Sequence, residues 1–319
     1  MLRLIKHLVD ASWIPEGVGA HVYRSIGMRT LKMFNPFLAC DHIVQPSSTK
    51  GGFPWHPHAG METITYMLSG GMAHEDFTGS QGLLFPGDLQ FMTAGRGIVH
   101  AEMPVNLDNQ TVKGIQLWID LPQDLKDIDP EYRDLRAWEY PTATSEDGQV
   151  QVKIISGRAL GIEHRRPLVK IPLDYYHYTV QPQATFTQEV DPEWSYFLYN
   201  FSDGTIDIES QTVKPHTNVF FNDGGDIIEG TNNGNEPVEF VLVGGPKLNQ
   251  KVLHYGTFIG TSNAYITEKV ADFENKDNAF APLHHWQSAF SDGVPPQFIA
   301  DQVAARQQRM PVLQTAEAR

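Results

Sequence analysis

The sequence contains little cysteine, no long apolar run and few clustered basic residues. Cys40 is the only cysteine among 319 residues, which excludes an intrachain disulfide and a metal site built from several cysteines. No apolar run approaches the roughly 18 residues that a membrane-spanning helix requires, and charge interrupts residues 1–7 too early for a secretory apolar region. We therefore expect no membrane association and a cytoplasmic location, and we interpret Cys40 as a buried thiol rather than a redox group.

Acidic residues outnumber basic ones. Asp and Glu total 38 against 24 Lys and Arg, which gives a formal net charge of −14. Phosphate backbones and anionic lipids repel such a chain unless its basic residues cluster, and Arg165–Arg166 is the longest basic run. This balance predicts no direct nucleic-acid binding and favours small molecules or proteins as partners. A hydrophobic fraction of 41% is enough for a sizeable core and excludes a wholly disordered chain.

Short apolar or alternating segments separated by glycine-rich turns indicate many short strands, as in a sandwich or barrel. A charged, proline-containing segment at residues 122–141 is typical of a connector, with one helical turn, between two such units. Residues 297–309 have a helix-forming composition and predict a short C-terminal helix, followed by a frayed tail. The clearest predicted strands are residues 63–68, 114–119, 150–155 and 238–243, and a weak internal repeat relates residues 66–71 to 197–204.

Two pairs of residues carry the chemistry: His56 with His58, and His100 with Glu102. A spacing of two residues places both members of a pair on one face of a strand. About forty residues separate the pairs, so we expect them to face each other across the lumen of a small barrel. Three imidazoles and one carboxylate suit Fe, Mn, Co, Ni, Cu or Zn and leave coordination positions open, as in a catalytic metal site.

The structural alternative is that these histidines are ordinary surface or core residues. The chain has 13 histidines, so one His-x-His sequence has little weight by itself. The second pair, together with the glycines that precede each pair, favours the metal site. Other histidines lie outside such pairs, and we interpret the following as surface or core residues: His21, His74, His177, His216, His254, His284 and His285.

Two motifs resemble those of a known family. Residues 56–63 (HPHAGMET) resemble the first motif of the cupin superfamily, and residues 87–102 (GDLQFMTAGRGIVHAE) resemble the second motif in the form peculiar to the pirin family. The resemblance extends over residues 2 to 285. Supporting matches are residues 16–19, 24–27, 35–38 and 41–42 before the motifs, and residues 242–249 and 255–258 in the second half.

The resemblance implies an all-β bicupin, in which two double-stranded β-helix (jelly-roll) barrels lie in tandem and a short helical tail follows. We place the N-terminal metal-binding cupin at residues 1–135, a degenerate C-terminal cupin without metal at 136–285, and an extension at 286–319. In the second unit, the positions that match the first pair lie near residues 185–189 and contain no histidine. The positions that match the second pair lie near residues 228–231 and contain only Glu229.

The family's metal ligands correspond to His56, His58, His100 and Glu102, which would hold one divalent metal, usually Fe(II). Glu62 stands where many cupins have a carboxylate ligand, and we interpret it as either a support close to the metal or a purely structural residue. Apolar residues near the motifs are candidates for a pocket lining or for ordinary core: Phe53, Trp55, Met61, Phe91 and Met92.

Two functions follow from the resemblance. The first is a metal-dependent dioxygenase that cleaves flavonols such as quercetin with O2 (the quercetin 2,3-dioxygenase reaction), with Glu102 as the general base that removes the 3-hydroxyl proton. The alternative is a non-enzymatic, iron-dependent regulatory protein that binds transcription factors or metabolic enzymes. Oxygen uptake with a panel of flavonols distinguishes the two hypotheses.

Overall fold

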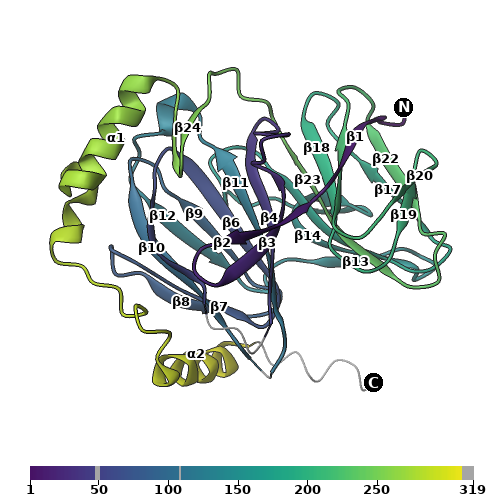
Figure 1. Cartoon of the computed structure of the whole chain (residues 1–319). Coiled ribbons are helices and arrows are strands. Elements are labelled where there is room, and N and C mark those ends of the chain that lie inside the picture. Colours follow the sequence, from purple (N-terminus) through teal and green to yellow (C-terminus); the bar gives the residue numbers. More distant parts are fainter. Residues whose placement is uncertain (47–50, 108, 311–319) are drawn as a thin grey trace.

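The computed structural model describes residues 1–46, 51–107 and 109–310, and these residues form two β-sandwiches that lie side by side (Figure 1). Each sandwich combines one large sheet and one small sheet. The first unit has, in spatial order, a large sheet of β12 (Glu131–Leu135), β9 (Leu89–Thr93), β6 (Met61–Ser69), β11 (Val112–Asp120), β4 (Phe37–Gln45), β3 (Ala20–Ile26) and β2 (Ser12–Glu16), and a small sheet of β5 (Phe53–His58), β10 (Ile98–Val105), β7 (Gly71–Asp76) and β8 (Gln81–Leu84).

The second unit repeats this arrangement. Its large sheet contains, in spatial order, β1 (Ile5–Asp10), β21 (Thr217–Phe221), β18 (Ser195–Asn200), β23 (Val238–Gly245), β16 (Asp174–Val180), β14 (Val150–Ala159) and β13 (Thr142–Thr144). A further strand, β15 (Ile162–His164), pairs with β14. Its small sheet contains β17 (Thr185–Glu189), β22 (Ile227–Thr231), β19 (Ile206–Ile208) and β20 (Gln211–Val213). The order β5-β10-β7-β8 therefore corresponds to β17-β22-β19-β20, and β6 corresponds to β18. The weak repeat between residues 66–71 and 197–204 reflects this last correspondence.

The first strand of the chain crosses to the second unit. β1 pairs with β21 at the edge of the second large sheet, in the place that β12 occupies beside β9 in the first. One edge of each large sheet is thus formed by a strand that is distant in sequence from its partner: β1 beside β21 in the second unit, and β12 beside β9 in the first. The division of the chain at residues 135 and 136 stays a prediction.

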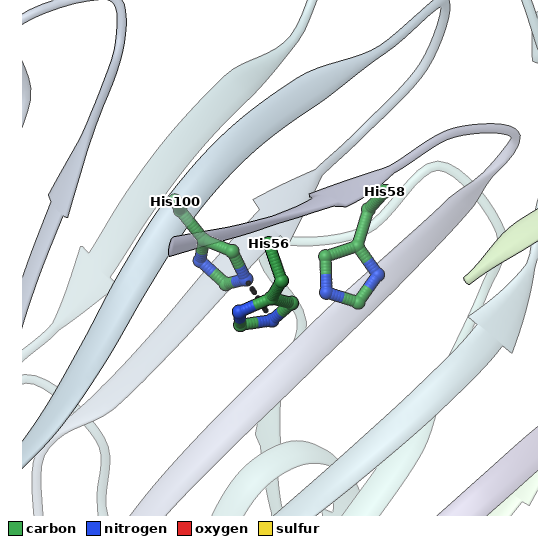
Figure 2. A group of neighbouring side chains, drawn as sticks. All are labelled: His56, His58 and His100. Carbon is green, nitrogen blue, oxygen red and sulfur yellow. Dashed lines mark hydrogen bonds between the residues drawn. The ribbon is translucent and has the colours of Figure 1, made fainter. Parts of the chain in front are cut away.

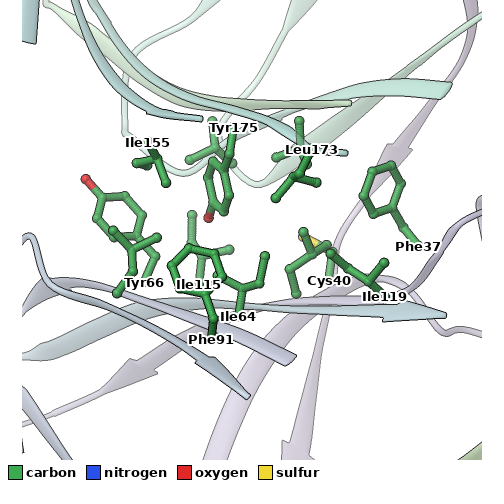
Figure 3. Packing of buried hydrophobic residues seen from close by; sticks show 14 of the residues in the cluster. Phe37, Cys40, Ile64, Tyr66, Phe91, Ile115, Ile119, Ile155, Leu173 and Tyr175 are labelled. Atoms are coloured by element: carbon green, nitrogen blue, oxygen red, sulfur yellow. The ribbon is translucent and has the colours of Figure 1, made fainter. Parts of the chain in front are cut away.

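The two large sheets pack face to face over a shared apolar core. Figure 3 shows Ile64, Tyr66 and Phe91 of the first unit opposite Ile155 and Tyr175 of the second, and all five are buried. Strand alternation turns Thr65, between Ile64 and Tyr66, to the other face of β6, where it reaches into the first sandwich. Because both faces of this sheet are covered, residues 61–67 of β6 are all buried, including the polar Glu62, Thr63 and Thr65.

Cys40 also lies in this core, as the sequence analysis expects. Its thiol is 1% exposed, and burial raises its pKa well above the ordinary value. A thiol that stays protonated and inaccessible is a poor nucleophile and a poor redox group.

The strand predictions are confirmed, because residues 63–68, 114–119, 150–155 and 238–243 lie within β6, β11, β14 and β23. The helical turn in the connector is η1 (Gln123–Leu125), but the connector also contains β12, so the prediction of a simple linker is incomplete. The hairpin of β24 (Leu253–Tyr255) and β25 (Phe258–Gly260) then leads into the helices α1 (Asn263–Asn275), η2 (Asn278–His284) and α2 (Pro296–Arg309).

Helix α2 matches the helix predicted from residues 297–309, whereas α1 has no counterpart in the sequence analysis. Ile266, Val270 and Phe273 of α1 have the spacing of a helical apolar stripe, and they are partly buried against the core cluster that contains Phe258 and Phe280. Among the described residues, no helix is long and apolar enough to cross a membrane.

The described part of the C-terminal extension packs on the first unit. The ring of Phe290 is buried and contacts Phe298 of α2 at 5.2 Å between centroids. Glu75 of β7 accepts hydrogen bonds from the backbone N–H groups of Ala289 (3.1 Å) and Phe290 (3.0 Å). The frayed tail expected after Met310 lies outside the described residues.

Candidate metal centre

Two paired strands of the small sheet bring the metal-ligand candidates together. β5 and β10 are antiparallel neighbours, with His56 directly opposite His100 and His58 opposite Ile98. The expectation that the two pairs face each other across the lumen is therefore wrong. Of the strands between them in the sequence, β6 and β9 belong to the large sheet. β7 pairs with one edge of β10, so the other edge of β10 is available to pair with β5.

The three imidazoles converge on one point (Figure 2). One ring nitrogen of each of His56, His58 and His100 lies within 4.8 Å of the others. The Nε2 atoms of His56 and His100 are 3.1 Å apart. Two nitrogens bound to one metal at about 2.0–2.1 Å and roughly at right angles have a similar separation, so the spacing fits a shared ion.

Hydrogen bonds and burial prepare the three rings to act as ligands. Nδ1 of His56 lies 2.8 Å from the carbonyl oxygen of Pro54, and since a carbonyl only accepts, this nitrogen carries the proton and Nε2 keeps its lone pair. Nδ1 of His100 lies 3.3 Å from the Tyr132 hydroxyl. Burial, aided by the neighbouring imidazoles, holds the pKa of His58 and of His100 well below the usual range.

Nδ1 of His58 has no hydrogen-bond partner among the described residues, although this side chain is buried. A buried polar atom without a partner is costly. A metal ion at the centre of the three rings would take the imidazole lone pairs that face one another, whereas Nδ1 of His58 points away from the other two rings (Figure 2). The donor set thus fits the implied metal on the grounds of both spacing and protonation.

Glu102 lies beside the imidazoles and is also buried. Its Oε2 atom is 3.9 Å from Nε2 of His100. The hydroxyl of Thr65 donates to Oε1 at 3.0 Å, and Nε2 of Gln116 donates to Oε1 and Oε2 at 3.0 and 2.9 Å. Oε1 accepts two of these bonds and Oε2 only one, so Oε2 is the oxygen better placed to bind an ion or a proton.

Glu62 does not join this group. Its Oε1 accepts from the Thr93 hydroxyl at 2.6 Å and its Oε2 from the backbone N–H of Lys170 at 2.9 Å. Strand alternation places Glu62 on the same face of β6 as Ile64, away from the face on which Thr65 meets Glu102. The structure therefore favours the structural alternative for Glu62, which ties β6 to the second unit.

A cavity of about 190 Å³ opens beside the site, and His56 and Glu102 form part of its wall. Apolar side chains make up another part of the wall, and Arg24, Asp41 and Glu16 form a charged side. Arg24 is bound to Asp41 by two hydrogen bonds of 2.7 and 2.5 Å, which fix both side chains. The apolar lining consists of Val22, Ile43, Phe53, Pro54 and Trp118.

Of the five lining candidates from the sequence, Phe53 alone borders this cavity. Trp55 is 49% exposed, and the other three are core residues: Met61 and Met92 in one cluster and Phe91 in another. The sequence analysis missed Gln116, Thr65 and Tyr132. The period of two in β11 could have indicated Gln116, because it places this polar side chain on the same face as Trp118.

The second unit has no equivalent site. The strands β17 and β22 pair as β5 and β10 do, with Phe186 opposite Gly230 and Gln188 opposite Ile228. Phe186 fills the space over Gly230, where even a Cβ atom would lie 2.8 Å from the ring. Among the described residues, the three-histidine group is the only cluster of three or more His, Cys, Asp or Glu side chains close enough to share a metal.

Comparison with known families decides the identity of the fold. The pirin family model matches residues 19–119, and the model of the pirin C-terminal cupin domain matches residues 175–279. The chain belongs to the pirin family. The predicted family and the predicted tandem-cupin fold are thus confirmed. The first matched segment falls in the first sandwich, and the second covers most of the second sandwich and continues through β24, β25 and α1, which pack against the first unit.

Pirins of mammals and plants are similar to this pirin-family chain over most of its length. Pirin of Rattus norvegicus and pirin of Homo sapiens are each 40% identical over 277 residues, which cover 86% of this chain and 92% and 93% of the respective relative. Pirin-like protein 2 of Arabidopsis thaliana is 36% identical over 280 residues and covers 86% of this chain, with 84% of that relative matched.

Solved structures share the fold at lower identity. A quercetin 2,3-dioxygenase from Acinetobacter baumannii has a TM-score of 0.78 at 22% identity and covers 86% of this chain and 98% of that one. The bacterial pirin YhhW from Escherichia coli, solved in complex with nickel(II), has a TM-score of 0.59 at 19% identity and covers 76% of this chain and 99% of that one. The histidine cluster of this pirin-family chain is arranged so that it could hold a single metal ion.

Proposed function

We propose that this pirin-family chain is a metal-dependent dioxygenase that cleaves flavonols such as quercetin with O2, and that its resident metal is Fe(II). The observation that carries the proposal is the cavity of about 190 Å³ whose wall contains His56 and Glu102 together with apolar side chains. The quercetin 2,3-dioxygenase with the same fold makes this reaction a natural candidate. The proposed ligands are His56, His58, His100 and Glu102.

The ligand set gives the chemical reason. A redox-active first-row metal held there would supply open positions for the adjacent hydroxyl and carbonyl oxygens of a flavonol and would allow electron transfer to O2. Three neutral imidazoles and one carboxylate are compatible with Fe(II), and also with Mn, Co, Ni, Cu or Zn, so the choice of iron is part of the proposal.

The chain's own residues would perform the remaining steps. Oε2 of Glu102, which accepts only one hydrogen bond in the structure, would loosen from the metal and accept the proton of the flavonol 3-hydroxyl. Thr65 and Gln116 would keep the carboxylate oriented while it moves the proton. Phe53 and Trp118 would offer apolar surfaces to the flavonol rings and exclude water from them.

The overall reaction is balanced without another reactant. One flavonol and one O2 give a ring-opened ester, which carries a carboxylate, and one carbon monoxide. Both oxygen atoms of O2 enter the ring-opened ester, and carbon monoxide keeps the oxygen of the 3-hydroxyl group. The proton that Glu102 removes is returned to the new carboxyl group, which then ionises in water.

The test measures oxygen consumption and carbon monoxide release with a panel of flavonols, normalised to the metal content of the freshly purified protein. Equimolar O2 uptake and CO release would support the proposal. No turnover with any flavonol would contradict it and would favour the non-enzymatic, iron-dependent regulator, whose partners would then be sought by capture with the reduced and the oxidised protein. Cell fractionation would test the cytoplasmic location, which stays a prediction.

A further inference from the structure

A second and larger cavity lies between the two units. It has a volume of about 550 Å³ and is lined by Tyr66 and Lys113 of the first large sheet and by Lys153, His177 and Glu239 of the second. We call it the inter-sheet cleft. It shares no lining residue with the cavity beside His56, and its volume lies in the range of small-molecule sites.

One lysine in this cleft lacks a close ion-pair partner. Among the described residues, four lysines are buried or half-buried, and three of them have a carboxylate oxygen close to Nζ: Lys126 with Asp120 at 2.5 Å, Lys170 with Glu131 at 2.6 Å and Lys269 with Asp127 at 2.8 Å. The fourth is Lys153, and the described residues include no carboxylate within 4.0 Å of its ammonium group. Glu239 attracts this partly desolvated cation only from beyond ion-pair distance, which leaves part of its desolvation cost uncompensated, so Lys153 is the exception that calls for a ligand.

Lys113 brings a second ammonium group to the same cleft. This lysine is exposed, and it too has no ion pair with a described residue. The two cations come from different units, Lys113 from β11 and Lys153 from β14. In a chain with a net charge of −14, these lysines bring two ammonium groups to facing sheets of one cleft, and Glu239 attracts both from beyond ion-pair distance.

The wall behind these lysines is fixed by a chain of hydrogen bonds. Nε2 of His177 donates to Oε2 of Glu239 at 2.8 Å, and Nδ1 accepts from the Tyr66 hydroxyl at 2.7 Å. Glu239 is therefore engaged with His177, and it attracts Lys153 and Lys113 without an ion pair to either. The ring of Phe201 lies edge-on to His177, with 5.1 Å between centroids, and adds an aromatic surface to the cleft.

We propose that the inter-sheet cleft binds a small aromatic carboxylate, with its anionic group at Lys153 and Lys113 and its ring against Phe201. The carboxylates of Glu239 and Asp203 also line the cleft, and they would repel a dianionic phosphate more strongly than a singly charged carboxylate. The site goes beyond the proposed function, because it uses none of the proposed metal ligands.

The test uses 4-hydroxybenzoate as the probe and the neutral 4-hydroxybenzamide as its matched control, with binding measured by calorimetry. The double variant His56→Ala with His58→Ala, which lacks two proposed metal ligands, is measured beside the wild type. Binding of the acid at the metal centre would be lost in this variant, whereas binding in the inter-sheet cleft would remain. We expect the acid to bind both proteins equally and the amide to bind at least tenfold more weakly.

Variants locate the site. Lys113→Gln with Lys153→Gln should weaken 4-hydroxybenzoate binding at least tenfold, whereas Lys214→Gln with Lys251→Gln, which changes two exposed lysines outside the cleft, should leave it unchanged. In protein labelled with ¹³C-methyl methionine, the signal of Met67, which lines the cleft, should shift on addition of the acid.

The proposal is overturned if the acid does not bind, if acid and amide bind the wild type equally, or if the lysine double variant binds like the wild type. Binding that disappears in the double variant His56→Ala with His58→Ala would assign the acid to the metal centre and would also overturn it. The comparison of acid and amide needs no variant, so the result stands even if the lysine double variant fails to fold.

Discussion

The side-chain amide of Gln116 donates to both carboxylate oxygens of Glu102, at 3.0 and 2.9 Å. These two side chains come from different sheets of the first sandwich, Gln116 from the large sheet and Glu102 from the small one. The pair therefore joins the two sheets at the proposed metal ligand, and the orientation of Glu102 depends on a residue outside the two motifs.

We expect Gln116→Leu to weaken metal binding by about 10–100-fold, because loss of a partner that orients a ligand has effects of this size. The measurement is competition with a chelator for Fe(II) under anaerobic conditions. Gln151→Leu, at an exposed position on β14, serves as the control. An unchanged metal affinity in the Gln116 variant would mean that the imidazoles alone set the affinity.

We expect the double variant His56→Ala with His58→Ala to retain less than a tenth of the wild-type metal, because it removes two of three converging imidazoles. Metal content is measured by elemental analysis after purification. The matched control is His284→Ala with His285→Ala, which removes two exposed histidines and should leave the metal content unchanged. Wild-type metal content in the His56 and His58 variant would place the metal elsewhere.

We expect Glu102→Gln to lower flavonol turnover per bound metal by about 10²–10⁴-fold, the usual cost of removing a general base. Metal content should fall less, because the three imidazoles remain and an amide oxygen can still bind weakly. Glu62→Gln is the control, since Glu62 contacts Thr93 and Lys170 instead of the metal site. Full activity per metal in Glu102→Gln would show that Glu102 acts as a ligand only.

We expect Arg306→Met to lower the free energy of unfolding by about 1.5–3 kcal/mol, the range for a hydrogen bond to a charged group. Nη1 of Arg306 in α2 lies 2.5 Å from Oδ2 of the fully buried Asp88. Arg136 also binds this oxygen, at 3.0 Å, and keeps the loss below that of an isolated buried charge. Urea unfolding checks the value.

Arg309→Met is the control for that measurement, because Arg309 lies in the last turn of the same helix and is exposed. Its effect should stay within about 0.5 kcal/mol, as for most surface substitutions. Equal effects of the two variants would mean that the contact with Asp88 contributes nothing to the stability of the unit.

The sequence by itself determined the local structure. Alternation and turns located the strands around residues 63–68 and 114–119 because side-chain direction repeats every two residues in any strand. The same period placed His56 and His58 on one face, and the absence of histidine near residues 185–189 and 228–231 agrees with the apolar filling of the second unit.

Only the tertiary structure decided which faces and strands meet. Alternation assigns Glu62 to one face of β6 and Thr65 to the other, but it does not say which face looks toward the histidines. The pairing of β5 with β10, the crossing of β1 to the second unit and the approach of Lys113 to the inter-sheet cleft join residues that are distant in the chain. Such contacts follow from the packing of whole sheets, which has no signature in a local pattern of residues.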